Sequence, residues 1–213
     1  PTARVLEKKV AFLEQAEDAL ALASGMAAIS TTLLALVEKG DHLLVVSCAY
    51  GPVHTFCDTT LAKLGIQTEY FSPQEAANLS SRIKPNTRLI YLESPGSVTF
   101  DIQDLRSAAR VARQHGVITL VDNSWATPLY QNPIALGIDL VLHSGTKYIG
   151  GHSDLLLGLV AGSAHLMSRV RGMARLLGGV LSPDDAYLAI RGLRTLPVRM
   201  ARHQASALRT ARW

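Results

Sequence analysis

Apolar positions along the chain repeat with two different periods. Near the start, Leu6, Val10 and Leu13 recur at the spacing of one helix face, with charged residues between them. Short runs rich in β-branched and apolar residues, such as residues 117–121, are typical of buried strands. Strands are predicted at residues 21–23, 43–46, 66–71, 87–93, 117–121, 139–143 and 155–161. Helices are predicted at residues 6–19, 24–37, 51–64, 74–83, 101–115, 163–177 and 182–192, and from about residue 195 onward.

Helices and strands therefore alternate through the sequence. Such alternation predicts an α/β fold with a doubly wound, mostly parallel sheet that has helices on both faces. Sheets of this kind bind ligands at the carboxyl ends of their strands. Because Glu93, Asp122 and Lys147 all lie at or just after predicted strand ends, we expect a site at this edge of the sheet.

Composition and charge narrow the class of protein. The 213 residues are 48% hydrophobic and 18% charged, which suffices for one large globular domain. The net charge is +4, and basic residues gather at helical spacings between residues 169 and 212, which favours a solvated or partner-facing helix over a nucleic-acid patch. No signal peptide and no apolar run long enough to cross a membrane are found. Cys48 and Cys57 lack metal-ligand spacing, so we expect free thiols, a cytoplasmic protein and no metal site.

The richest segment is the run from His143 to Asp154, which contains Lys147. Residues 140–142 before it are apolar, and a lysine after a buried strand is a candidate Schiff-base nucleophile, because partial desolvation favours the free amine. Hydroxyls at Ser144 and Thr146 suit a phosphate group. Together these residue types predict a pyridoxal phosphate (PLP) site.

A second strand end supplies the partner that PLP needs. Asp122 follows the predicted strand 117–121, and an aspartate beside the pyridine nitrogen keeps that nitrogen protonated. Alone, an aspartate such as Asp122 is usually a helix cap or turn residue, and a lysine such as Lys147 is usually a solvated loop charge. The occurrence of both, each after a buried strand, favours the functional interpretation.

Two further segments could hold the phosphate and the ring. Ser24, Gly25 and Met26 open a predicted helix, whose free N–H groups and dipole favour an anion, although Ser24 could be a simple N-cap. Tyr50 follows the predicted strand 43–46 and could stack on a pyridine ring, or be an ordinary surface aromatic.

Six segments carry a family resemblance that spans the chain. They are SGMAAIS (24–30), AYGPVHTFC (49–57), LESPGS (92–97), VDNSWATPL (121–129), TKYIGGHSD (146–154) and RGLRTLPVR (191–199). The chain resembles the γ-family of PLP enzymes of cysteine and methionine metabolism, with fold type I, and within it most closely the bacterial cystathionine β-lyases.

The resemblance implies a role for each candidate. Lys147 is similar to the lysine that forms the Schiff base with PLP, Asp122 to the partner of the pyridine nitrogen, and Tyr50 to the ring-stacking tyrosine, which also assists proton movement. The phosphate binders implied by the resemblance are Ser24, Gly25, Met26, Ser144 and Thr146. Ser97 stands where many relatives have an asparagine that contacts the ring hydroxyl, and its Pro-Gly-Ser context is similar to the β-lyase branch.

The resemblance also implies parts that lie outside the chain. Residues 1–192 are interpreted as the PLP-binding domain, and residues 193–213 as the start of a helix leading to a C-terminal domain that the chain lacks. The family takes a Tyr-x-Arg phosphate clamp from a neighbouring subunit and an arginine for the substrate carboxylate from the C-terminal domain. We therefore expect a homo-oligomer, with a dimer of dimers as the first hypothesis.

The implied reaction is β-elimination on a small amino-acid substrate. Cystathionine would give homocysteine, pyruvate and ammonia, as in methionine biosynthesis. The alternatives within the family are a cystathionine γ-synthase, a γ-lyase or a broad cysteine desulfhydrase. A nucleotide-binding dehydrogenase needs a glycine-rich G-x-G-x-x-G turn after the first strand, which is absent. A non-catalytic scaffold remnant would differ by its lack of the yellow colour of bound PLP.

Overall fold

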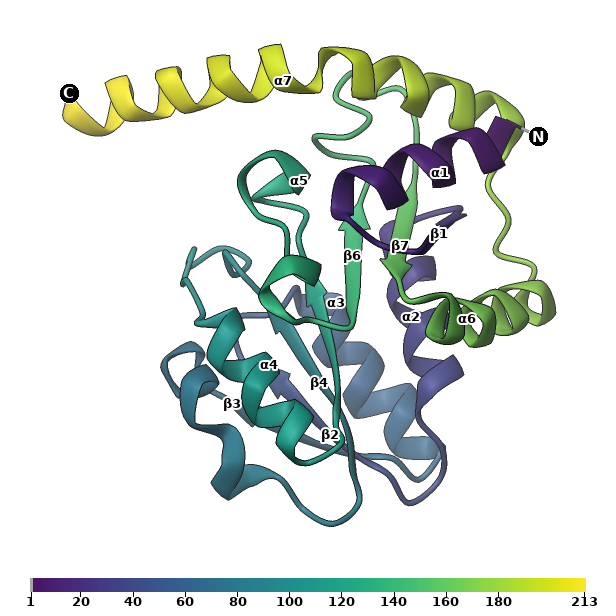
Figure 1. Ribbon diagram of the computed structural model, residues 1–213, viewed down its shortest axis with the longest axis vertical. Coiled ribbons are helices and arrows are strands. Elements are labelled where there is room, and N and C mark those ends of the chain that lie inside the picture. Colours follow the sequence, from purple (N-terminus) through teal and green to yellow (C-terminus); the bar gives the residue numbers. More distant parts are fainter. Residues whose placement is uncertain (1) are drawn as a thin grey trace.

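The sheet forms the centre of the molecule. The computed structural model describes residues 2–213, in which seven strands form one sheet in the order β1-β7-β6-β5-β4-β2-β3 (Figure 1). The strands are β1 Asp18–Leu22, β2 His42–Val46, β3 Gln67–Phe71, β4 Thr87–Glu93, β5 Ile118–Asp122, β6 Leu140–Ser144 and β7 Gly158–Gly162. Neighbours from β6 to β3 are parallel, and only β7 runs antiparallel to its neighbours β1 and β6. The predicted α/β fold with a mostly parallel sheet is confirmed.

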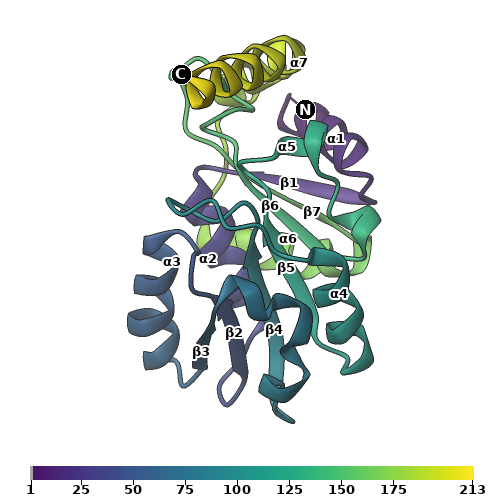
Figure 2. The same ribbon diagram turned by 90° about the vertical axis from the view of Figure 1, so that its left-hand side faces the viewer.

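Helices cover both faces of this sheet. The helices are α1 Thr2–Glu14, α2 Gly25–Leu36, α3 Gly51–Thr55 with the π-helical η1 Phe56–Leu61, the 3-10 helix η2 Pro73–Arg82, α4 Leu105–Gln114, α5 Thr127–Tyr130, the 3-10 helix η3 Ile134–Leu136, α6 Ala164–Leu177 and α7 Pro183–Arg212. Figure 2 shows α3 and α4 on opposite sides of the sheet. In Figure 1, α7 crosses the top of the molecule above α1, and its C-terminal half extends beyond the other elements.

Two apolar cores lie on opposite faces of the sheet at its β1–β7 end. Alternation along β1 shows the division, because Leu20 and Leu22 pack into the larger core with α2 and α6, whereas Ala19 and Ala21 pack into the smaller core with α1 and α7. Every residue of β2 is buried, which explains why the strand has a continuous apolar run rather than an alternating pattern. A fully buried leucine of this kind stabilises the fold by roughly 1.5–3 kcal/mol.

The C-terminal helix differs from the prediction. Two helices were expected, at residues 182–192 and from 195, but one helix runs from Pro183 to Arg212 with Pro197 inside it. Gly192 does not end a helix; it lets α7 approach closely, because a Cβ there would collide with the carbonyl oxygens of Ile149 and Gly150. The expected domain boundary after residue 192 therefore falls inside a continuous helix, and it stays a prediction.

The predicted helix at 101–115 begins later than expected. Asp104 is its N-cap and accepts a hydrogen bond from the Ser107 N–H at 3.0 Å, so α4 starts at Leu105. The segment before it contains Val98 and Phe100 with φ of 66° and 59°, which no regular helix admits.

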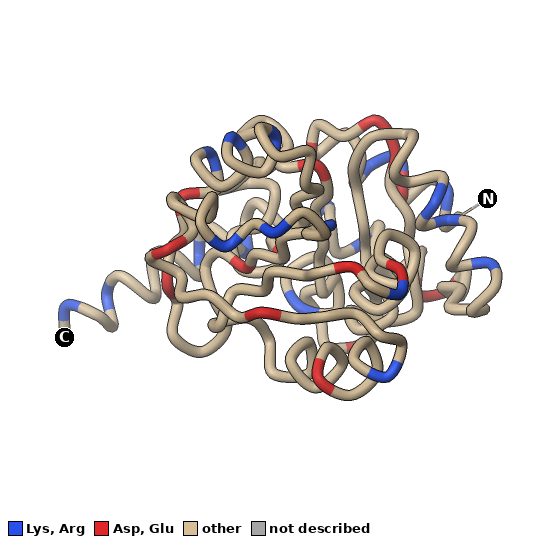
Figure 3. The backbone as a smooth tube through the Cα atoms, turned by 90° about the horizontal axis from the view of Figure 1, so that it is seen from below, with Lys and Arg blue, Asp and Glu red and all other residues tan. Residues whose placement is uncertain are grey.

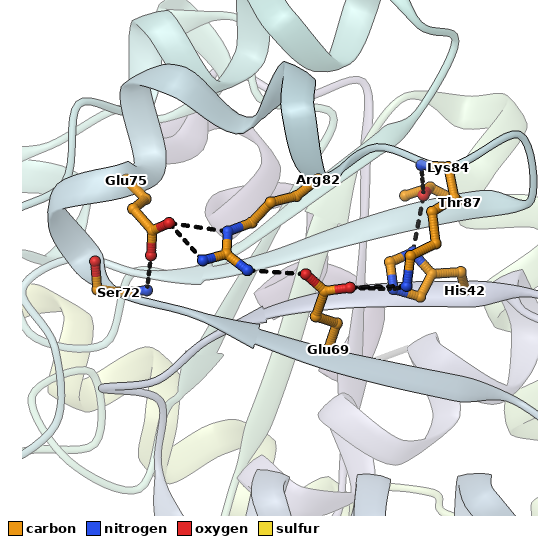
Figure 4. Close-up of polar contacts among 7 residues, drawn as sticks. All are labelled: His42, Glu69, Ser72, Glu75, Arg82, Lys84 and Thr87. Atoms are coloured by element: carbon orange, nitrogen blue, oxygen red, sulfur yellow. Dashed lines mark hydrogen bonds and ion pairs between the residues drawn. The ribbon is translucent and has the colours of Figure 1, made fainter.

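A polar network stabilises the sheet where β2 and β4 begin. The Nδ1 atom of the buried His42 lies 2.8 Å from Thr87 Oγ1, and Glu69 on β3 accepts hydrogen bonds from Arg82 and Lys84 at 2.8 Å each (Figure 4). Burial lowers the pKa of His42. The network fastens η2 and the edge strand β3 at the opposite ends of the strands from those that carry the candidate site.

Charges of both signs are mixed over most of the described residues, and the C-terminal part of α7 is basic. Figure 3 shows Lys and Arg positions interspersed with Asp and Glu, and a run of basic positions near the end of α7. Among residues 2–213, the helices are all too short or too polar to span a membrane.

Candidate functional site

The candidate residues meet at the carboxyl edge of the parallel strands. Lys147 lies in the loop after β6, Tyr50 in the loop after β2, and Asp122 at the end of β5. The Lys147 Nζ atom is 5.5 Å from the centroid of the Tyr50 ring. A cleft of about 860 Å³ opens beside Lys147 and is also lined by Arg199 and His203 of α7, whereas Tyr50 and Asp122 do not line it. The fold thus brings together groups that are far apart in the sequence.

Lys147 is presented by a short turn rather than by the strand itself. The Lys147 N–H donates to the Ser144 carbonyl at 3.1 Å, and the Gly150 N–H donates to Gly145 at 2.7 Å. This turn lifts the side chain above the buried end of β6, so Lys147 is exposed in the structure. The partial desolvation expected for Lys147 stays a prediction, because burial in this chain ends with the strand.

Asp122 is fixed by hydrogen bonds between neighbouring loops. Its side chain is 7% exposed, and its Oδ1 atom accepts from the Ser124 N–H at 2.9 Å. The Ser124 hydroxyl accepts from the Ser144 N–H at 2.6 Å, which ties the end of β5 to the end of β6. Asp122 is thus held beside the loop of Lys147 with one carboxylate oxygen already committed to the backbone.

Glu93 is a second buried carboxyl group at this edge. It ends β4 and is the register partner of Asp122 on β5, and it is 4% exposed. Its Oε2 atom accepts from the Tyr50 N–H at 2.8 Å, and its Oε1 atom accepts from the Ser97 hydroxyl at 2.5 Å. Burial and the neighbouring Asp122 raise the pKa of Glu93 to about 7.

The N-terminus of α2 provides an anion site beside β6. Ser24 is the N-cap, because its hydroxyl accepts from the Ala27 N–H at 3.0 Å, as the simpler interpretation of this residue required. The first N–H groups of α2, at Gly25 and Met26, have no helical partner and favour an anion. A Cβ at Gly25 would lie 3.0 Å from Ser144 Oγ, so glycine brings this N-terminus against the Ser144 hydroxyl. The cradle fits a phosphate group.

The Thr146 hydroxyl has different neighbours from the Ser144 hydroxyl. Its hydroxyl accepts from the Leu157 N–H at 3.0 Å and donates to the Leu157 carbonyl at 3.2 Å. These two bonds fasten the Lys147 turn to the segment before β7. The phosphate contact expected for Thr146 stays a prediction. In the structure its hydroxyl holds the Lys147 turn against Leu157.

Two residues that shape the site were not among the sequence candidates. Glu93 was recognised only as a polar residue at a strand end, since nothing in the sequence shows its contacts with Tyr50 and Ser97. Gly158 opens β7, and a Cβ there would collide with the Ser24 carbonyl oxygen, so only glycine lets α2 begin this close to the sheet. A glycine inside the predicted strand at residues 155–161 was the available signal.

A lysine, a buried aspartate and an anion-binding helix N-terminus at the carboxyl edge of a doubly wound sheet are characteristic of the PLP-dependent enzymes of fold type I. A family model described as Cys/Met metabolism PLP-dependent enzyme matches residues 1–213. The chain belongs to this family, and the family is PLP-dependent.

Individual relatives agree with this family and differ in their reactions. Cystathionine beta-lyase from Bordetella avium is 43% identical over 208 residues, which cover 97% of this chain and 52% of that protein. L-methionine gamma-lyase from Pseudomonas putida is 42% identical over 209 residues, with coverage of 97% and 52%. The crystal structure of metB from Corynebacterium glutamicum superposes with a TM-score of 0.90 at 37% identity, covering 93% of this chain and 52% of that one. The chain therefore spans about half the length of the curated relatives it matches.

Proposed function

We propose that this chain forms the PLP-binding part of a cystathionine β-lyase. The enzyme would break the carbon–sulfur bond of cystathionine by β-elimination and yield homocysteine, pyruvate and ammonia, in methionine biosynthesis. The observation that carries the proposal is the meeting of Lys147, Tyr50 and the buried Asp122 at one strand edge, next to an anion-binding helix N-terminus.

Each of these residues has a defined task toward the cofactor. When bound, PLP supplies an electron sink that makes the α-proton of an amino acid acidic. Lys147 would hold the cofactor through its amine, and its Nζ atom would then take the α-proton from the substrate. Asp122 would hold the proton on the pyridine nitrogen, and the Tyr50 ring would cover one face of the pyridine ring.

The phosphate would be bound by backbone and hydroxyl donors. The N–H groups of Gly25 and Met26 lie at the positive end of α2, and Ser144 adds a hydroxyl beside them. Ser24 caps the helix and thereby keeps these donors in place, while Thr146 is proposed as a further phosphate contact.

Preference for β-elimination rests on sequence features near Ser97. The run Glu93-Ser-Pro-Gly-Ser97 has serine where γ-acting relatives often have asparagine, and the structure turns the Ser97 hydroxyl toward Glu93. The alternative is γ-elimination or a related replacement reaction, since an L-methionine gamma-lyase is as similar to the chain as a cystathionine beta-lyase is. A broad cysteine desulfhydrase is the remaining variant of the same chemistry.

The protein is proposed to act as a homo-oligomer, with a dimer of dimers as the first hypothesis. Val98, Phe100 and Ile102, which are exposed apolar residues, lie in the loop after β4, near the carboxyl edge. A neighbouring copy that covered them would also close the site from outside. The cytoplasmic location stays a prediction from the sequence.

Product analysis tests the proposed reaction. The protein that contains this chain is incubated with PLP and cystathionine, and the 2-oxo acids are separated by chromatography. Pyruvate with homocysteine supports the β-lyase, whereas 2-oxobutyrate with cysteine shows a γ-lyase. Absence of any visible absorption from bound PLP would contradict the cofactor assignment itself.

A further inference from the structure

The loops after β2 and β4 are fastened to each other by Glu93. Its two carboxylate oxygens bind different loops, with Oε2 accepting from the Tyr50 N–H at 2.8 Å and Oε1 accepting from the Ser97 hydroxyl at 2.5 Å. The Glu93 residue is 4% exposed, and both bonds are partly buried. Glu93 therefore sets the backbone position from which the Tyr50 ring projects.

Backbone contacts next to Glu93 strengthen the same junction. The Ser97 N–H donates to the Cys48 carbonyl at 2.9 Å, and a Cβ at Gly96 would collide with Cys48 Sγ. Gln103 adds a side-chain amide that donates to the Glu93 carbonyl and to Cys48 Sγ, the latter at 3.4 Å. The loop after β4 is thus packed directly on the loop that leads to Tyr50.

The Tyr50 side chain itself has little support. It is 43% exposed, and Tyr50 is an N-cap of α3 that makes no side-chain capping bond. Its ring nevertheless lies 5.5 Å from Lys147 Nζ, at the place where a ring bound to that lysine would need a stacking partner. The position of the Tyr50 ring therefore depends on its backbone, and the bond from the Tyr50 N–H to the almost completely buried Glu93 is a contact that can fix that backbone.

We propose that Glu93 is a positioning residue that, with Ser97, holds Tyr50 in place to stack on the cofactor ring, an inference that rests on the proposed PLP site. Glu93 does not touch the cofactor in this account. Ser97 acts through Glu93 as well, because its hydroxyl proton is directed to the carboxylate and not to the cleft.

A double-mutant cycle on PLP affinity tests this inference. PLP binding is titrated by visible absorbance and by visible circular dichroism for the unmodified chain, Glu93→Ala, Tyr50→Ala and the double variant. Glu93→Ala should weaken PLP binding about tenfold, which corresponds to the loss of one hydrogen bond to a charged group. In the Tyr50→Ala background the same substitution should change PLP affinity little, since the residue that it positions is gone.

Two conservative variants separate positioning from a general effect on folding. Glu93→Gln keeps an oxygen for the Tyr50 N–H and an amide that can donate to Ser97, so it should restore the affinity of the unmodified chain. Ser97→Ala removes only one of the two bonds to Glu93 and should lower PLP affinity by a smaller factor. In the Tyr50→Ala background, Ser97→Ala should leave PLP affinity unchanged. If Glu93→Ala fails to fold, Ser97→Ala with and without Tyr50→Ala completes the cycle.

The outcomes distinguish the inference from the function on which it rests. Unchanged PLP affinity in Glu93→Ala, or in Ser97→Ala if Glu93→Ala does not fold, would overturn the positioning role and leave the PLP site intact. The same conclusion would follow if the losses of PLP affinity in the double variant were the sum of those in the single variants. Failure of the unmodified chain to bind PLP at all would overturn the proposed function and this inference together.

Discussion

Glu93 and Asp122 are register partners on the parallel strands β4 and β5, so two carboxyl groups lie side by side at the carboxyl edge of the sheet. Both are nearly buried, and the pKa of Glu93 rises to about 7 from an ordinary value of 4.5 because of burial and the charge of Asp122. Between about pH 4.5 and pH 7 the folded chain therefore keeps a proton on Glu93 that the unfolded chain releases, and above this range Glu93 is a carboxylate.

This difference predicts a pH dependence of stability. Between pH 4.5 and 7 the unfolded state binds fewer protons at Glu93 than the folded state, so the free energy of unfolding falls as the pH rises. The contribution is fully present below the unfolded pKa, and its loss amounts to about 3 kcal/mol by pH 8. Urea denaturation of the unmodified chain and of Glu93→Gln across this range measures it. An equal pH dependence in both proteins would contradict the assignment.

Asp122→Asn tests whether Asp122 keeps the pyridine nitrogen of PLP protonated, and it should leave the fold intact. Asparagine keeps an oxygen for the Ser124 N–H, so the melting temperature should change little. Exchange of the substrate α-proton with solvent, followed by nuclear magnetic resonance, should slow by several orders of magnitude, because a neutral amide cannot hold the ring nitrogen protonated. Near-normal exchange in this variant would rule out the role.

Glu14 joins α1 to the strands beneath the site. Its fully buried carboxylate contacts His143 Nε2 at 2.5 Å and accepts from the Asn123 side chain at 3.1 Å. Glu14→Ala leaves both partners buried without this acceptor, and we expect a loss of about 3–5 kcal/mol in unfolding free energy. Lys9→Ala, an exposed change on the same helix, is the control and should alter stability by less than about 0.5 kcal/mol. Equal effects of the two substitutions would show that the buried cluster does not stabilise the fold.

Two glycines in helices should respond to alanine with opposite signs. Gly172 in α6 has open space at its Cβ position, so Gly172→Ala should stabilise the chain by roughly 1 kcal/mol. Gly192 in α7 packs on the backbone of Ile149 and Gly150, and Gly192→Ala should destabilise by about 1–3 kcal/mol through overpacking. Chemical denaturation of both variants measures the pair. Stabilisation by Gly192→Ala would show that α7 does not press on the turn of Lys147.

The strands were the most predictable part of the fold. Leu140, Val141 and Leu142 form a continuous apolar run, and this run is buried on both faces of the sheet, as the sequence predicts. The course of α7 was less predictable, because Gly192 and Pro197 suggest an interruption while packing on residues 149–150 keeps the helix continuous.

The candidate site was predictable as a set of strand ends but not as a network. The predicted strand ends placed Glu93, Asp122 and Lys147 at one edge, where the structure has them. The contacts of Glu93 with Tyr50 and Ser97 depend on which strands are neighbours, and periodicity alone does not show this. The exposure of Lys147 could not be predicted either, since it depends on how the turn after β6 leaves the sheet.

Borohydride reduction identifies the lysine that binds PLP. The chain is mixed with PLP, reduced with sodium borohydride, digested, and mapped by mass spectrometry, with Lys147→Ala as the matched control. The account predicts a pyridoxyl group on Lys147 and its loss in the variant. Labelling of Lys147→Ala at the level of the unmodified chain, or labelling concentrated on another lysine, would contradict it.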